Sequence, residues 1–137
     1  MSTLNRRSAL GIGLVAAVAA VAKRAAAQTM DMTAGKDTML APGVVQRTYG
    51  MSPAIIPGFK SVAMRDIIIQ PGSKTADNAM KNAMVCHITE GELRLVQDGN
   101  TFTAKKNHVW TCGKDTREQA FNDGNVVAIM RITDLMA

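Results

Sequence analysis

The chain has 137 residues, which is the length of one ordinary domain with a short extension. Its 16 basic residues outnumber its 11 acidic ones, but four basic residues and no acidic residue fall within the first 27 positions. The remainder carries 12 basic and 11 acidic residues, a net charge of +1. Because nucleic-acid binding depends on a basic surface that releases counterions, this balance argues against a nucleic-acid partner.

Residues 1–27 have the pattern of an export signal. Arg6 and Arg7 form a positive start, and a weakly hydrophobic run of Ala, Val, Gly and Leu covers residues 9–22. Ala25–Ala27 then offers the small side chains that a signal peptidase requires. We therefore expect cleavage after residue 27 and a periplasmic mature protein.

The string Asn5–Leu10 (NRRSAL) resembles a twin-arginine signal. The basic pair Lys23 and Arg24, just before the cleavage site, also favours that route over general secretion. This pair closes an apolar run of about 15 residues, which is short for a membrane-spanning helix. We expect no stable membrane anchor after cleavage; the alternative is an uncleaved N-terminal anchor.

Residues 28–43 (QTMDMTAGKDTMLAPG) are polar and show no periodicity. Two Gly and a Pro interrupt them. We interpret them as a flexible lead to the folded domain.

Residues 44–137 predict an all-β domain without a helix. Short runs with alternating or continuous apolar residues are separated by turn signals, of which Asp98-Gly99 is a strong hairpin signal because both residues tolerate positive φ. Regular strand spacing of this kind is typical of a sandwich or a closed barrel. The expected strands are Val44–Gly50, Ser61–Gln70, Ala83–Thr89, Glu92–Gln97, Thr101–Ala104, His108–Thr111, Gln119–Phe121 and Asn125–Thr133.

The spacing of residues 71–130 resembles the cupin family, whose members are conserved barrels of the jelly-roll type. The first cupin motif has the form G-x5-H-x-H-x3-E-x6-G. The matching positions are Gly72, Asn78, Met80, Met84 and Gly91. The second motif, G-x5-P-x-G-x2-H-x3-N, falls on Asn107, Gly113, Asp115, Glu118 and Asn122, of which only the last keeps the family residue. The resemblance implies a cupin-like β-barrel.

In the cupin family two histidines, a glutamate and a third histidine bind a divalent metal inside the barrel. The resemblance places Asn78, Met80, Met84 and Glu118 at those four positions. Amide and thioether groups do not replace imidazole at a hard or borderline ion, so Glu118 is the one strong ligand among them. We therefore expect no metal at the usual cupin centre.

The two histidines do not restore that centre. If Met84 points inward, strand alternation directs Cys86 inward and His87 outward. His108 follows Asn107 at the start of a strand, near a turn. We interpret both histidines as surface residues.

Cys86 and Cys112 lie near the two motifs and leave three alternatives open. An exported chain with an even cysteine count favours a disulfide, which would contribute roughly 3–4 kcal/mol in the loop-entropy model. The second alternative is two buried free thiols. The third is a soft-metal site for copper built from Met80, Met84 and Cys86, with Cys112 as a further donor.

The leading hypothesis for function is an exported binding domain whose pocket holds a small apolar or organic ligand. The predicted pocket residues are Asn78, Met80, Met84, Cys86, Arg117 and Glu118. The alternative is an oxidoreductase-like or isomerase-like enzyme in which Glu118 is the catalytic general base. A homodimer is a further expectation, with Arg131 contacting Asp66 or Glu92 of a second copy.

Overall fold

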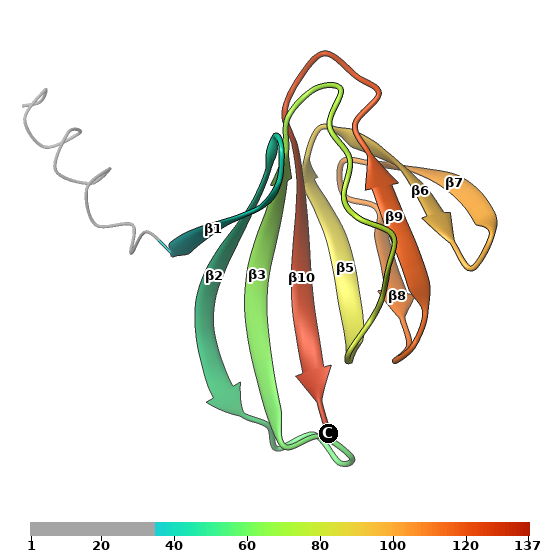
Figure 1. Cartoon of the computed structure of the whole chain (residues 1–137). Helices are drawn as coiled ribbons and strands as arrows, with labels where there is room; N and C mark the ends of the chain where they lie inside the picture. The colour runs from blue at the N-terminus through green and yellow to red at the C-terminus, as the bar shows by residue number, and fades with distance from the viewer. Residues whose placement is uncertain (1–34) are drawn as a thin grey trace, which may run out of the picture. The chain divides into compact units, whose positions relative to one another are not determined.

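The computed structural model describes residues 35–137, which form two antiparallel sheets facing one another as a jelly-roll barrel (Figure 1). The larger sheet has the strand order β1-β2-β3-β10-β5-β8, and the smaller has the order β4-β9-β6-β7. The strands of these residues are β1 (Lys36–Ala41), β2 (Val44–Pro53), β3 (Ser61–Ile69), β4 (Asn78–Ala79), β5 (Ala83–Glu90), β6 (Glu92–Gln97), β7 (Asn100–Lys105), β8 (Val109–Cys112), β9 (Arg117–Phe121) and β10 (Ala128–Met136). Within this part of the chain no helix is long and apolar enough to cross a membrane. The predicted export signal lies outside the described residues.

The core lies between the two sheets and is aliphatic and sulfur-rich. Strand β10 shows how the sequence builds it: buried and half-buried residues alternate along the strand, because successive side chains point to opposite faces of the sheet. The buried hydrophobic residues are Val44, Ile67, Ile69, Met84, Cys86, Ile88, Leu93, Leu95, Ala104, Cys112, Ala120, Ala128, Met130 and Ile132. No aromatic side chain is among them, so the sequence fills this interior with aliphatic chains, methionine and thiols.

The hairpin predicted at Asp98-Gly99 is confirmed. Gln97 pairs with Asn100, so the connection between β6 and β7 has two residues. Their φ values of 46° and 82° are the positive pair that a type I′ turn requires. This turn fixes the register of the β6–β7 hairpin, and β6 in turn pairs with β9, which carries Glu118.

The structure adds two strands that the sequence did not predict, β1 and β4. Residues 36–41, expected within the flexible lead, instead pair with β2 at the edge of the larger sheet. Most of β1 is exposed, so its residues carry no alternating apolar signal; the Arg47–Asp37 ion pair and backbone hydrogen bonds hold it instead. Strand β4 has only two residues, both exposed. Edge strands of this kind are defined by pairing rather than by burial.

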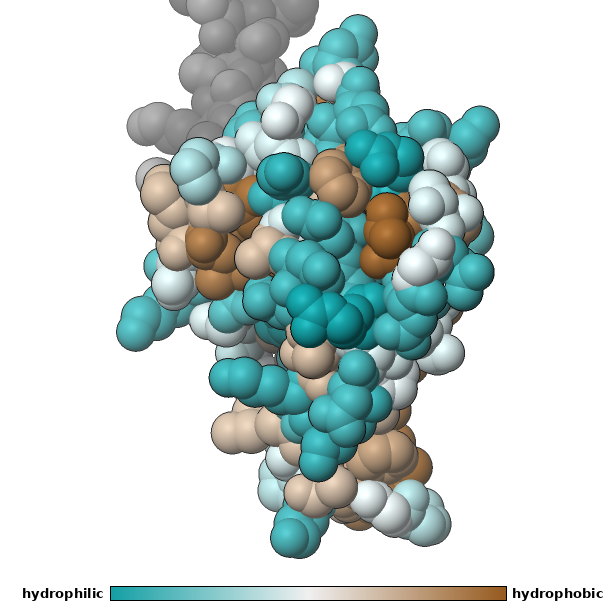
Figure 2. Space-filling view, turned by 45° about the vertical axis from the view of Figure 1, so that its right-hand side comes forward, coloured by the Kyte–Doolittle hydropathy of each residue, from teal (hydrophilic) through white to brown (hydrophobic). Residues whose placement is uncertain are grey.

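Several large hydrophobic residues of the described part of the chain are exposed. Figure 2 shows a face of the domain on which hydrophilic residues prevail and hydrophobic residues form separate patches. Ile55 is fully exposed and Met51 is 70% exposed near the β2–β3 connection, while Met39 on β1 is 72% exposed.

Arg131 and Asp66 bind each other within the chain, which corrects the expectation that they meet across a dimer. They are directly opposite one another on β10 and β3. Arg131 Nε donates to Asp66 Oδ1 at 2.8 Å and Tyr49 Oη donates to Oδ2 at 2.8 Å. Burial opposes ionisation of Asp66, but the hydrogen bonds from Arg131 and Tyr49 outweigh it and lower the pKa of this carboxyl.

We expect Asp66→Asn to lower the free energy of unfolding by about 2 kcal/mol at neutral pH, because a buried carboxylate loses charged hydrogen bonds. The folded-state pKa of Asp66 lies below its unfolded value, so this stabilisation is present above the ordinary aspartate pKa and is lost as pH falls through the folded value. Urea unfolding of both proteins at neutral and acidic pH measures the difference. Asp37→Asn removes an exposed, solvent-screened ion pair and is the control, with an expected loss much smaller than that of Asp66→Asn. A pH-independent difference for Asp66→Asn would contradict the prediction.

Candidate functional site

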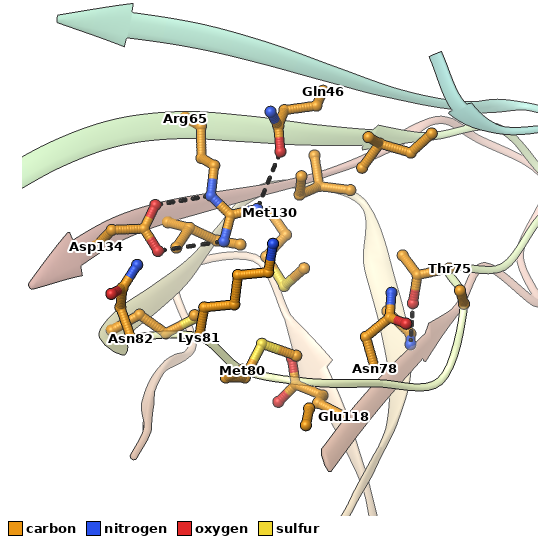
Figure 3. A pocket seen from close by; sticks show the side chains of 17 residues that line it. Gln46, Arg65, Thr75, Asn78, Met80, Lys81, Asn82, Glu118, Met130 and Asp134 are labelled. Carbon is orange, nitrogen blue, oxygen red and sulfur yellow. Dashed lines mark hydrogen bonds and ion pairs between the residues drawn. The ribbon is translucent and has the colours of Figure 1, made fainter. Parts of the chain in front are cut away.

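A cavity of about 480 Å³ opens between the two sheets (Figure 3). Its walls come from β1, β2, β3, β9 and β10 and from the segment 75–84 that includes β4 and enters β5. The apolar part of the lining includes five buried residues: Ile67, Met84, Ala120, Met130 and Ile132. Polar groups lie around it, chiefly Gln46, Arg65, Asn78, Lys81, Glu118 and Asp134. The cavity therefore combines an apolar body with polar groups around it.

The four positions that correspond to the cupin metal ligands all line this cavity. Asn78 on β4 pairs with Glu118 on β9, which brings the two motifs together. Met80 follows β4 and Met84 lies at the start of β5. Asn78 is exposed at the cavity, whereas Met84 and Glu118 are buried to 3% and 4% exposure.

Two other residues predicted for the pocket, Arg117 and Cys86, do not line it. Arg117 precedes Glu118 on β9, so alternation turns it to the opposite face, where it forms an exposed ion pair with Asp77. It lines a separate hollow beside Asp98. Cys86 points inward as predicted, but it lies one inward position further along β5 than Met84 and is fully buried in the core.

The pocket also contains charged and polar residues that were not predicted from the sequence. Arg65 donates to both carboxylate oxygens of Asp134, at 2.8 and 3.2 Å, and to Gln46 Oε1 at 3.1 Å. Figure 3 shows this group on one side of the cavity, across from Asn78, Met80 and Glu118. The sequence did contain a signal for Asp134: it follows Met130 and Ile132 at a spacing of two residues, so it takes the next inward position of the strand and is charged. A charged residue at an inward position of a strand needs a partner or a cavity.

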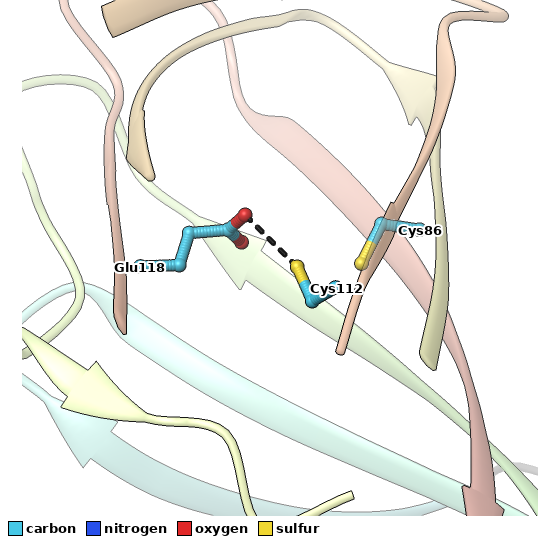
Figure 4. Close-up of side chains that lie close together, drawn as sticks. All are labelled: Cys86, Cys112 and Glu118. Atoms are coloured by element: carbon cyan, nitrogen blue, oxygen red, sulfur yellow. Dashed lines mark hydrogen bonds between the residues drawn. The ribbon is translucent and has the colours of Figure 1, made fainter. Parts of the chain in front are cut away.

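A second cluster joins Cys86, Cys112 and Glu118 in the buried interior (Figure 4). The two Sγ atoms and a carboxylate oxygen all lie within 4.8 Å of one another. The Cys112 thiol donates to Glu118 Oε2 at 3.2 Å. The neighbouring Cys112 thiol and burial both raise the pKa of Cys86 above that of an ordinary thiol.

The cysteines are free thiols in the structure, in place of the disulfide that the even count favoured. The β5–β8 register gives the reason, since Met84 is opposite Cys112 and Cys86 is opposite Trp110. The cysteines are therefore diagonal neighbours, whose Cα atoms in an antiparallel pair lie about 7–8 Å apart. A disulfide usually needs Cα atoms closer than about 6.8 Å, so closing one would require the backbone to move.

Hydrogen bonds from outside the cluster orient its side chains. Trp110 Nε1 donates to Glu118 Oε2 at 3.1 Å, and Gln97 Nε2 donates to Cys112 Sγ at 3.1 Å. Both hydrogen bonds to the Glu118 carboxylate that the structure shows reach Oε2. Glu118 also lines the cavity, so the pocket and the cluster share this residue.

Neither histidine lines the cavity. His87 is half-buried on the outward side of β5, opposite Val109 on β8 and Arg131 on β10. His108 is exposed and stacks on Phe102 with ring centroids 5.9 Å apart.

Comparison with known proteins assigns the fold. No protein-family model matches the sequence, and no curated protein matches it. An RmlC-like cupin from Shewanella frigidimarina NCIMB 400 is similar in structure, with a TM-score of 0.62 and 14% identity over 75% of this chain and 85% of the other. A cupin 2 conserved barrel domain protein from Salinispora arenicola CNS-205 gives a TM-score of 0.59 and 16% identity over 72% and 81% of the two chains. A sugar phosphate isomerase from a cupin superfamily, from Silicibacter pomeroyi DSS-3, gives 0.58 and 15% over 80% and 74%. The chain thus has the cupin fold.

The residues at the usual cupin metal positions do not fit that metal. Asn78, Met80, Met84 and Glu118 supply one amide, two thioethers and one carboxylate. The two thioethers are soft donors and the carboxylate is hard, so no common ion is satisfied by the set.

Proposed function

We propose that this protein is an exported cupin-fold binding domain that holds a small organic molecule in the cavity between its sheets. The observation that carries the proposal is the cavity of about 480 Å³, which combines a buried apolar wall with polar groups on both sides. That volume is within the range of about 300–1,000 Å³ typical of ligand pockets.

The charges around the cavity indicate the class of ligand. Arg65 and Asp134 neutralise one another through two hydrogen bonds. This leaves Lys81 and Glu118 as charges of opposite sign at the cavity. A ligand that is neutral or zwitterionic, with an apolar body and hydroxyl or carbonyl groups, matches this balance.

A fragment library observed by saturation-transfer NMR tests the proposed binding. We expect compounds of this class to bind the wild-type protein and to lose most of their signal in Ala120→Leu, because the larger side chain extends from a buried wall into the cavity. Ala137→Leu makes the same change at the exposed C-terminal residue, outside the cavity, and as the matched control should bind like the wild type. Absence of binding to the wild type, or equal binding to a folded Ala120→Leu protein, contradicts the proposal.

Export is part of the same proposal and rests on residues 1–27. We expect Arg6→Lys with Arg7→Lys to leave the full-length precursor in the cytoplasm, because the twin-arginine route requires the arginine pair. Cell fractionation with intact-mass measurement distinguishes the precursor from a mature protein that begins at Gln28. Unchanged periplasmic export of the double variant would rule out this route.

An isomerase-like activity is the second candidate, favoured by the buried Glu118 carboxylate on the cavity wall. As a general base it would remove a proton next to a carbonyl group and return it to the adjacent carbon. Aldoses and ketoses incubated in D₂O would then gain deuterium at that carbon. Glu118→Gln should slow this exchange by about 10²- to 10⁴-fold, whereas equal rates would exclude Glu118 as the base.

A further inference from the structure

We propose that Cys86, Cys112 and Glu118 form a binding site for a zinc-type divalent cation, set deeper in the barrel than the usual cupin metal position. The cysteines correspond to no ligand of the two cupin motifs, and only Glu118 occupies such a position. The metal site does not depend on the proposed ligand binding.

The donor atoms are already close to the separations that zinc requires. Zn–S and Zn–O bonds of about 2.3 and 2.0 Å in a tetrahedron place the donors roughly 3.5–3.8 Å from one another. In the structure the Cys112 Sγ to Glu118 Oε2 distance is 3.2 Å, and all three donor atoms lie within 4.8 Å of one another. Small side-chain rotations are therefore enough to surround an ion, and the strands need not move.

The frame that carries the donors is rigid. Cys86 and Cys112 belong to the adjacent paired strands β5 and β8, and Glu118 extends from β9 in the other sheet (Figure 4). All three residues are buried to 4% exposure or less. The ion would thus join the two sheets in a setting that excludes bulk water.

The hydrogen bonds around the cluster are an independent observation in favour of a metal site. Metal ligands are characteristically oriented by outer hydrogen-bond partners. Here Gln97 donates to the sulfur of Cys112 and Trp110 donates to the carboxylate of Glu118. These two donors would also offset the negative charge that two thiolates and a carboxylate leave around a divalent ion.

The donor set selects the ion. Two thiolates with a carboxylate suit Zn²⁺, which accepts both kinds of ligand, whereas Cu(I) favours all-sulfur sets and Mg²⁺ or Ca²⁺ favour oxygen. Binding would displace the two thiol protons into solution without any redox change. Glu118 also lines the cavity, so the fourth position of the tetrahedron is available on that side to a water molecule.

Cobalt substitution tests the site on the full chain, reduced and stripped of metal. We expect one Co²⁺ per chain with thiolate-to-cobalt charge-transfer absorption, displacement by Zn²⁺, and release of two protons. Cys86→Ser and Cys112→Ser should abolish the charge-transfer intensity of a two-thiolate site. Gln97→Leu, which leaves all three ligands in place, should weaken binding by about 10- to 100-fold.

Met80→Leu is the matched control, because it removes a cavity thioether outside the proposed set and should leave cobalt binding unchanged. The wild-type spectrum and the Gln97 variant keep the test decisive if a cysteine variant fails to fold. Three results would overturn the site: no cobalt absorption by the reduced wild type, equal affinity in Gln97→Leu, or binding of Cu(I) alone that Met80→Leu abolishes. The third result would point instead to a copper site at the methionines.

Discussion

Replacing Asn122 with alanine is expected to lower the free energy of unfolding by about 3 kcal/mol. The side chain is 2% exposed, and its Nδ2 donates to the carbonyls of Ile69 at 2.8 Å and Val126 at 2.9 Å. Its Oδ1 accepts from the backbone N–H of Gly124 at 3.0 Å. Alanine would remove all three hydrogen bonds, at about 1–3 kcal/mol for each backbone group that is then buried without a partner.

The Asn122 prediction is checked by urea denaturation monitored through Trp110 fluorescence. Asn125→Ala removes the same side chain from a neighbouring exposed position and should change stability by less than about 0.5 kcal/mol. Asn122→Asp keeps the acceptor for Gly124 but removes the amide donor, so it should be at least as destabilised as Asn122→Ala. A stable Asn122→Ala protein would show that the 123–127 loop does not depend on this side chain.

Asn122 is the one position at which this chain has the residue of the second cupin motif, and its role in the structure is to anchor a loop. Its three hydrogen bonds join the end of β3 to the loop before β10, so it supports the barrel rather than the metal. The motif spacing therefore predicted the fold, because turns and loop anchors such as Asn122 keep their structural function. It could not predict the chemistry, because the residues that carry chemistry at those positions differ.

The candidate site was predictable where alternation along one strand decides it. Met84 and Cys86 both point inward on β5, as expected from their spacing of two. The same rule places Arg117 on the face of β9 opposite to that of Glu118. The prediction that Arg117 lines the pocket was therefore wrong, and the sequence already contained the reason. The diagonal placement of Cys86 and Cys112 could not be predicted, because it depends on the register between β5 and β8, which hydrogen bonding in three dimensions sets.

Gly91→Ala is expected to lower the free energy of unfolding by about 3 kcal/mol or more, or to prevent folding. Gly91 connects β5 of one sheet to β6 of the other, with a φ of +70°. A Cβ atom there would lie 2.7 Å from the carbonyl oxygen of Val127 and 2.8 Å from Cα of Ala128. Both atoms are backbone, so the clash cannot be relieved by rotating a side chain, and the conformational cost of about 1–2 kcal/mol adds to it.

Gly99→Ala separates the two causes. Gly99 has a φ of +82° but no heavy atom within 4 Å of an added Cβ, so alanine there carries only the conformational cost. Urea or thermal unfolding of the two variants should therefore show a loss of about 1–2 kcal/mol for Gly99→Ala and a clearly larger loss for Gly91→Ala. Equal losses would mean that β10 can withdraw from the turn without cost. In that case the two sheets could be joined without the close contact between the β5–β6 turn and the β10 backbone.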